Sequence, residues 1–123
     1  SCENNGMGIA AFSPLAQGVL TGKYSNGKIP AGSRGSNDKQ NMWMKDEIAN
    51  LALLSKIDSL KPIAEGYDLS IAQLCLAWAL RLNSISSLII GASSEKQLNE
   101  NLKASGVKLD QGTVDQMNAL FPL

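Results

Sequence analysis

Hydrophobic positions along the chain form two short continuous runs and several stripes at helical spacing, a pattern that predicts an α/β fold. The apolar runs at 8–12 and 88–90 are typical of strands, and Leu88-Ile89-Ile90 has the β-branched character of a strand buried on both faces. Helical stripes separate the two runs. Because parallel strands require a crossover between them, we expect these two to pair in parallel.

The helical stripes predict three helices outside the second strand unit. A long helix begins near Lys45 and ends at Gly66, and Pro62 is expected to kink or restart it. Ser70 caps the next helix, and Gln73 completes a capping box. Its apolar stripe predicts a buried face, with Trp78 in the core, formed by Ile71, Leu74, Cys75, Trp78, Ala79 and Leu82. A last helix follows a cap at Asp110 and carries Val114, Met117, Leu120 and Phe121.

The stretch 87–101 predicts a strand, a tight turn and a helix. Gly91 ends the strand and permits close backbone approach, and Ser94 caps the helix in a capping box with Gln97. Leu98 and Leu102 are expected on the buried side, and the opposite side carries Ser93, Gln97, Glu100 and Asn101. Unpaired amides at the helix start favour an anion, usually phosphate. The alternative is an ordinary capped helix without a ligand.

Two loops are further candidates for ligand contact. Ser13-Pro14-Leu15-Ala16 follows the first strand at its carboxyl end, where parallel α/β folds bind ligands, although local chemistry alone favours a plain turn. Residues 25–40 are rich in glycine, serine and asparagine and carry Lys28, Arg34 and Lys39. This segment is either a basic lid over a phosphate or a solvated mobile loop.

Composition narrows the function further. The chain has 123 residues, no formal net charge, 44% hydrophobic and 18% charged residues, a profile that favours a single globular domain and argues against nucleic acid or membrane insertion. Cys2 and Cys75 form no CxxC motif, which suggests free thiols in a reducing cytoplasm. The absence of histidine excludes histidine-dependent hydrolases and histidine-ligated zinc in this chain. Because the sequence begins Ser-Cys, we expect it to be a piece of a longer protein.

Four motifs in order, SPLAQGVLTGKY, SRGS, IAQLCLAWAL and LIIGASSEKQLNEN, resemble the carboxyl-terminal part of the aldo-keto reductase superfamily. The resemblance is nearest to the branch of the voltage-gated potassium channel beta subunits and their bacterial reductase relatives. It implies that residues 1–123 form one partial domain, the carboxyl-terminal part of a (β/α)₈ barrel. The runs 8–12 and 88–90 would then be barrel strands seven and eight.

The resemblance also implies an NADP(H) site. The nicotinamide and pyrophosphate path would be lined by Phe12, Ser13, Pro14, Leu15 and Ala16. Lys23 and Arg34 would face the phosphates, with Arg34 nearest the 2′-phosphate, and the adenosine would be held by Gly91, Ser93, Gln97, Glu100 and Asn101. Other branches have arginine at Gln97 and lysine at Ala92, and channel beta subunits have tyrosine at Gly32. Because these side chains are absent here, a preference for NADP over NAD would depend on Arg34 and Lys23.

The resemblance places the catalytic tetrad of aspartate, tyrosine, lysine and histidine in an amino-terminal portion that these 123 residues lack. The intact protein is therefore expected to reduce a small aldehyde or ketone with NADPH, and the chain alone is expected to be inactive. A channel-associated regulatory subunit and a fragment without retained function are the alternatives. Two strands with open edges and an uncovered apolar face also predict self-association of the chain alone, as a homo-oligomer.

Overall fold

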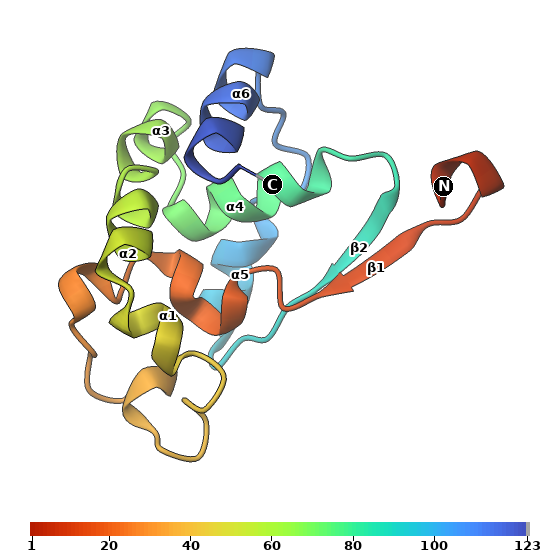
Figure 1. Cartoon of the computed structure of the whole chain (residues 1–123). Helices are drawn as coiled ribbons and strands as arrows, with labels where there is room; N and C mark the ends of the chain where they lie inside the picture. Colours follow the sequence, from red (N-terminus) through yellow and green to blue (C-terminus); the bar gives the residue numbers. More distant parts are fainter. Residues whose placement is uncertain (123) are drawn as a thin grey trace.

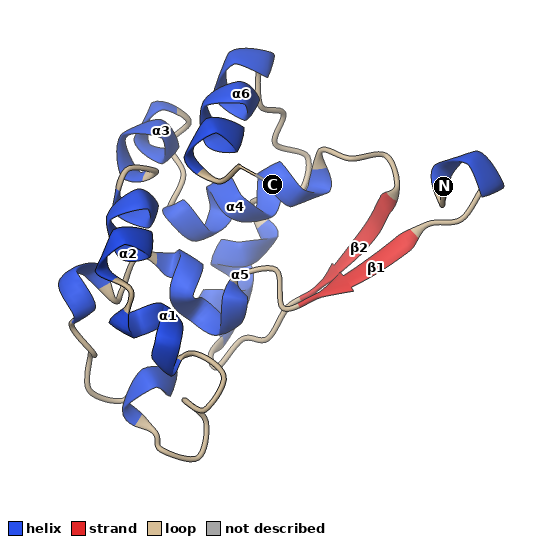
Figure 2. Cartoon of the chain, viewed as in Figure 1, coloured by secondary structure: helices blue, strands red, loops and turns tan. Residues whose placement is uncertain are grey.

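The computed structural model describes residues 1–122 and shows helices gathered on one side of a two-stranded sheet (Figures 1 and 2). The strands are β1 (Ile9–Phe12) and β2 (Ile85–Ile89). The α-helices are α1 (Lys45–Ala49), α2 (Leu51–Asp58), α3 (Lys61–Gly66), α4 (Ile71–Leu80), α5 (Glu95–Leu102) and α6 (Gln111–Leu120). Short 3₁₀ turns occupy Glu3–Asn5, Ala16–Thr21, Ser25–Gly27 and Arg34–Ser36. Within residues 1–122, no helix has both the length and the hydropathy needed to cross a bilayer.

The two strands pair in parallel, as predicted, with Ile9 opposite Ile85 and Phe12 opposite Ile89. An irregularity in the register falls between Ile9 and Ala10. The second strand begins earlier than predicted and ends at Ile89, so Ile90 lies outside it. The first strand excludes Gly8, where an added Cβ would overlap Ser86 Oγ. Close contact with the neighbouring chain segment therefore explains the glycine before β1.

The prediction that the second strand is buried on both faces is wrong for the described residues. Phe12 is 81% exposed and its neighbour Ile89 is 58% exposed. The helices lie on one side of the sheet, where β2 contacts α4 (Figure 1). Both side chains are exposed within residues 1–122, so the apolar face expected from the sequence is present and open to solvent.

The single helix predicted from Lys45 to Gly66 is three helices. The first break lies at Asn50, whose side chain accepts a hydrogen bond of 3.0 Å from the Leu53 amide and thereby caps α2. Asparagine favours this role because its side chain competes with the backbone for hydrogen bonds. The second break precedes α3, where Pro62 occupies the first turn, as expected for a residue without an amide donor.

The core lies among the helices. One cluster joins the segment after β1 to α1 and α2 and consists of Val19, Tyr24, Met44, Ile48, Leu54 and Ile57. A second joins α3, α4 and α6 and consists of Leu60, Ala64, Leu74, Cys75 and Met117. Leu20, Ile71 and Phe121 pack against both clusters. Through these shared residues the two clusters form one continuous hydrophobic core.

The predicted stripe of α4 is correct at its centre and wrong at its end. Leu74 and Cys75 are buried, whereas Leu82 is 45% exposed because the helix ends at Leu80. Trp78 packs against the second cluster, and its indole Nε1 donates to Asn118 Oδ1 at 3.2 Å. The Arg81 guanidinium lies 3.8 Å from the centre of the Trp78 ring. Trp78 thus links α4 to α6 and is partly buried at the edge of the core rather than fully inside it.

Two of the predicted helix starts are confirmed in atomic detail. At α4, the Gln73 amide donates to Ser70 Oγ at 3.1 Å and the Ser70 amide donates to Gln73 Oε1 at 2.9 Å, which completes the capping box. At α6, the Thr113 amide donates to Asp110 Oδ1 at 2.8 Å. The Tyr67 hydroxyl also donates to the Asp110 carboxylate and connects this cap to the end of α3.

Candidate functional site

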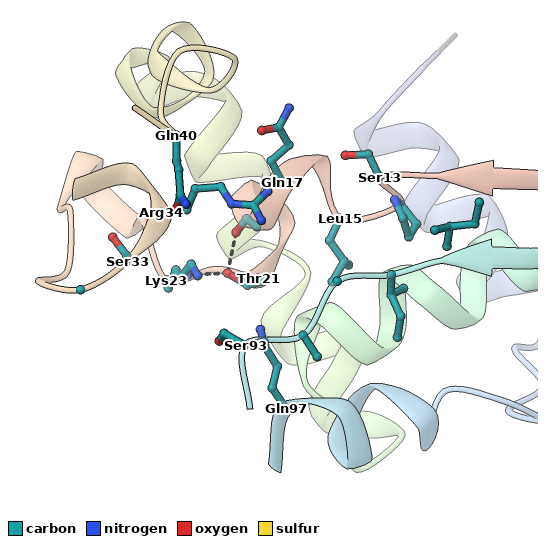
Figure 3. A pocket seen from close by; sticks show the side chains of 17 residues that line it. Ser13, Leu15, Gln17, Thr21, Lys23, Ser33, Arg34, Gln40, Ser93 and Gln97 are labelled. Atoms are coloured by element: carbon teal, nitrogen blue, oxygen red, sulfur yellow. Dashed lines mark hydrogen bonds between the residues drawn. The ribbon is translucent and has the colours of Figure 1, made fainter. Parts of the chain in front are cut away.

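A cavity of about 420 Å³ lies where the chain leaves the carboxyl ends of both strands (Figure 3). Three segments that are distant in sequence form its walls: 13–23 after β1, 32–40 in the long loop, and 89–97 from the end of β2 into α5. Its volume is within the range of about 300–1,000 Å³ that is typical of small-molecule sites. The cavity therefore joins both predicted ligand loops to the turn before α5.

The first wall begins with strained backbone. Ser13, Ala16 and Gln17 have φ values of 54°, 47° and 57°, and Gly18 follows at 102°. Residues other than glycine rarely adopt such left-handed conformations, and clusters of them are found mainly at functional sites. Hydrogen bonds from the Ala16 amide to the Ser13 carbonyl at 3.0 Å and from the Gly18 amide to the Leu15 carbonyl at 2.9 Å hold this turn.

The electrostatic character of the cavity is positive. Lys23 and Arg34 are its charged lining residues, and no acidic residue of the described chain lines it. In Figure 3 the Arg34 side chain extends toward Gln17, with Lys23 beside Thr21 on the same side of the cavity. The one salt bridge among residues 1–122 joins Lys96 to Glu100, so neither cation of the cavity is neutralised by an ion pair within this part of the chain. Such a site favours an anion.

The opposite wall differs from its predicted geometry. The Ser93 amide and hydroxyl both donate to Gln97 Oε1, at 2.8 and 2.9 Å, and the Gln97 amide donates to Ser94 Oγ at 3.2 Å. Ser94 is therefore the cap of α5, but Gln97 turns to Ser93 and the predicted reciprocal capping box is absent. The Gln97 carbonyl oxygen bonds to Ser93 because this residue provides two donors, its amide and its hydroxyl. The amides of Ser93 and Gln97 are therefore occupied and do not contribute to anion binding.

The orientation of α5 also departs from the prediction. Leu98 and Leu102 are 41% and 56% exposed, whereas Asn101 is buried. The reason is a contact with α4, because Gln73 Nε2 donates to the Glu100 carbonyl at 2.6 Å and brings the Asn101 side of the helix inward. Consequently the four polar residues expected on one face are divided, and only Ser93 and Gln97 reach the cavity.

Eight of the twelve predicted site residues line the cavity: Ser13, Pro14, Leu15, Lys23, Arg34, Gly91, Ser93 and Gln97. Ala16, Glu100 and Asn101 do not, and Phe12 stands exposed at the end of β1. Gly91 has no steric need to be glycine within the described chain, since an added Cβ there would meet no atom within 4 Å. The predicted close backbone approach at Gly91 is therefore not observed.

Sequence analysis missed several lining residues: Gln17, Gly18, Thr21, Gly32, Ser33, Gln40, Ile89, Ile90 and Ala92. Gln17, Gly18 and Thr21 fall inside the motif SPLAQGVLTGKY, so a signal for them existed. No sequence signal indicated Gln40, because the position of this residue depends on the path of the long loop. The Thr21 hydroxyl donates to the Gly18 carbonyl at 2.6 Å and stabilises the turn beside Lys23 (Figure 3).

Outside the cavity, two further observations on residues 1–122 bear on the chemistry of the chain. Burial raises the pKa of the Cys75 thiol to about 12, so this sulfur is protonated at neutral pH and is a core residue, as expected. Within residues 1–122 no group of three or more potential metal ligands gathers in one place. The cavity therefore has the features of a binding site for an anionic ligand.

The fold and the cavity together define a parallel α/β protein with a cationic pocket at the carboxyl ends of its strands. Residues 1–121 match the model of the aldo/keto reductase family, and the chain belongs to this family. It is 43% identical over 108 residues to a probable voltage-gated potassium channel subunit beta of Arabidopsis thaliana, covering 85% of this chain and 31% of the relative. A rice protein with the same description is 42% identical over 121 residues, covering 94% of this chain and 35% of the relative.

A bacterial relative, the L-glyceraldehyde 3-phosphate reductase of Escherichia coli strain K12, is 41% identical over 103 residues. That match covers 83% of this chain and 30% of the relative. The chain thus spans about a third of the length of the curated relatives it matches. These comparisons confirm the family and the branch that the sequence motifs indicated.

Proposed function

We propose that the chain forms the NADP(H)-binding end of an aldo-keto reductase, with β1 and β2 as the last two strands of a (β/α)₈ barrel. The observation that supports this proposal is the charge of the cavity, where Lys23 and Arg34 are lining residues and acidic residues of the described chain are absent. A dinucleotide with a 2′-phosphate carries several negative charges, and cations arranged in this way stabilise them.

The donor set fits such a cofactor. Arg34 offers a planar guanidinium suited to a phosphate monoester, and Lys23 offers a compact charge for a second phosphate group. On the opposite wall the Ser93 hydroxyl donates to Gln97 Oε1, so the donor that faces a ligand there is the side-chain NH₂ group of Gln97, and Leu15 adds an apolar surface for a ring. The cations sit near the loops rather than near the strand ends, so the phosphates would lie along 23–34 and the nicotinamide nearer Ser13.

When bound, the nicotinamide supplies the hydride that reduces a carbonyl carbon. The residues of this chain bind and orient the cofactor, and Phe12, exposed at the end of β1, is positioned to border the reaction site. Proton transfer by an imidazole has no source here, because the 123 residues contain no histidine. We therefore propose reduction of a small aldehyde or ketone for a protein that includes the remaining length of the relatives, and cofactor binding for this chain.

Nucleotide titration tests the proposal. NADP⁺ and NAD⁺ are added to the purified 123-residue protein, and binding is followed by calorimetry at low and moderate salt. We expect tighter binding of NADP⁺ and a loss of this preference as salt rises, because screening weakens the contribution of the cations. Equal affinity for both nucleotides, or no binding of either at millimolar concentration, would contradict the proposal.

A second candidate is a regulatory subunit of a membrane channel, and it is favoured by the two plant relatives described as probable channel subunits. This function does not exclude cofactor binding. It predicts that the protein co-purifies with a potassium channel from its own membrane fraction, whereas a reductase without this role is recovered free of channel protein.

A further inference from the structure

Tyr24 lies directly after Lys23 and is fully buried in the first core cluster, with 0% exposure. Its hydroxyl nevertheless has a specific partner, because the Gly35 amide donates to it at 3.1 Å. Gly35 is the residue after Arg34. A buried phenol thus contacts the backbone immediately beside the cation proposed to meet the 2′-phosphate.

The same peptide segment is held from its other side. Asn41 is buried, and its Nδ2 donates to the Gly35 carbonyl at 3.1 Å. The Asn37 amide donates to the Arg34 carbonyl at 3.1 Å and closes the 3₁₀ turn Arg34–Ser36. Gly35 is therefore fixed through both its amide and its carbonyl, by side chains that come from different segments.

Steric contact adds to these hydrogen bonds. A Cβ added at Gly35 would lie 2.8 Å from Tyr24 Cε1 and 3.1 Å from Ile48 Cδ1. The backbone of Gly35 consequently lies close to the Tyr24 ring, and the absence of a side chain permits this close approach. Gly35 is the one buried residue of 25–40, so this contact anchors the second half of the loop to the core.

We propose that Tyr24 is a positioning residue for the recognition of the 2′-phosphate. Its hydroxyl holds the Gly35 amide, and this contact fixes the direction in which the Arg34 side chain leaves the backbone and enters the cavity. The inference rests on the proposed function. It adds that the preference for NADP over NAD is determined partly by a buried residue that does not line the cavity.

The alternative role for Tyr24 is core packing alone, and nucleotide preference distinguishes the two. A packing residue affects both nucleotides equally through stability, whereas a positioning residue acts only where Arg34 meets the 2′-phosphate. Tyr24→Phe retains the ring and removes the hydroxyl. Tyr67→Phe is the matched control, since Tyr67 also has a hydrogen-bonded hydroxyl but contacts Asp110 and Thr113, which do not line the cavity.

The experiment compares the dissociation constants of NADP⁺ and NAD⁺ for the wild type and both variants at neutral pH. We expect Tyr24→Phe to weaken NADP⁺ binding roughly fivefold, the factor that corresponds to one net hydrogen bond, with little change for NAD⁺. Tyr67→Phe should change neither constant. If the wild type prefers NADP⁺ and Tyr24→Phe keeps that preference, the inference is overturned while the proposed function stands. If the wild type binds NADP⁺ and NAD⁺ with equal affinity, both the inference and the proposed function fail.

A second variant and a second measurement cover the case in which Tyr24→Phe does not fold. Asn41→Leu removes the donor to the Gly35 carbonyl without introducing a charge, and we expect the same selective loss of NADP⁺ affinity. Hydrogen exchange gives a readout that needs no nucleotide. The Gly35 amide should exchange faster in Tyr24→Phe or Asn41→Leu than in the wild type. Unchanged exchange in a folded variant would overturn the positioning role.

Discussion

The side-chain amide of Gln73 on α4 donates a hydrogen bond of 2.6 Å to the backbone carbonyl of Glu100 on α5. The carbonyl of the same side chain accepts from the Ser70 amide and completes the cap of α4. One buried glutamine therefore both starts a helix and determines how the next helix lies beside the cavity.

We expect Gln73→Glu to separate these two functions. A carboxylate still accepts from the Ser70 amide, but it cannot donate to Glu100, and repulsion between two buried oxygens should displace α5. Loss of a buried hydrogen bond with an unpaired carbonyl costs about 1–3 kcal/mol of unfolding free energy. Denaturant unfolding measures this loss, with Gln111→Glu as an exposed control. A variant as stable as the wild type would show that the link to α5 contributes nothing.

Arg34→Gln is expected to weaken NADP⁺ binding roughly tenfold and to leave NAD⁺ binding nearly unchanged, because a charge-assisted contact contributes about 1.5–3 kcal/mol. Lys28→Gln is the matched control, since it removes one positive charge from the same loop at a position that does not line the cavity. Fluorescence titration with NADPH and NADH measures both variants. Equal effects of the two substitutions would indicate a general charge effect and contradict a specific role for Arg34.

Gly35→Ala should destabilise the protein and reduce selectivity for NADP⁺ together. The added Cβ would press against the buried aromatic ring of Tyr24, and overpacking of this kind typically costs about 1–3 kcal/mol. Gly106→Ala provides a comparison outside the cavity, because its φ of 80° strains the backbone although no atom lies within 4 Å of the added Cβ. Thermal unfolding and nucleotide titration separate the two. Selectivity should survive in Gly106→Ala and fall in Gly35→Ala.

Thiol labelling tests the burial of Cys75. Its raised pKa, about 12, means that the native protein holds this proton when the unfolded chain has already lost it. A folded-state pKa above the unfolded value gives stability that is complete below the unfolded pKa and lost as pH rises toward 12. At pH 8 a thiol reagent should therefore react with Cys2 quickly and with Cys75 only after unfolding. Rapid reaction of two thiols in the native protein would contradict this arrangement.

Acid unfolding tests the cap of α6. The Tyr67 hydroxyl and then the Thr113 amide lower the pKa of Asp110 in the folded protein. A lowered folded-state pKa gives stability that is complete above the unfolded value and is lost as pH falls through the folded one. The stability difference between the wild type and Tyr67→Phe should accordingly shrink below about pH 4, where the unfolded carboxyl becomes protonated. A difference that stays constant down to pH 2 would exclude this linkage.

Local sequence signals predicted those features that depend on neighbours in the chain. Ser70 with Gln73 and Asp110 with Thr113 form caps as expected, because each needs only three residues of spacing. The same spacing at Ser94 predicted the cap correctly but not the reciprocal hydrogen bond, because the Gln97 side chain accepts from the amide and hydroxyl of Ser93 instead. Asn50 is a favourable residue for a helix start, but the apolar stripe runs on through this position and predicts one continuous helix.

Contacts between distant residues could not be predicted from one sequence. The link from Gln73 to Glu100 spans 27 positions and turns α5 away from its expected orientation, which exposes Leu98 and buries Asn101. For the cavity, the family motifs identified eight of the 17 lining residues. The contact from Tyr24 to Gly35 was not foreseen, because nothing in GKY or SRGS shows that one packs against the other.

The left-handed backbone after β1 has a consequence for engineering. Selection for heat resistance alone would favour substitutions that relax this turn, such as glycine at Ala16 or asparagine at Gln17, because both tolerate positive φ. Such changes would also loosen a wall of the cavity. We expect variants selected only for thermal stability to lose the preference for NADP⁺ over NAD⁺ before they lose other properties. Variants selected for that preference should keep the positive φ values of this turn.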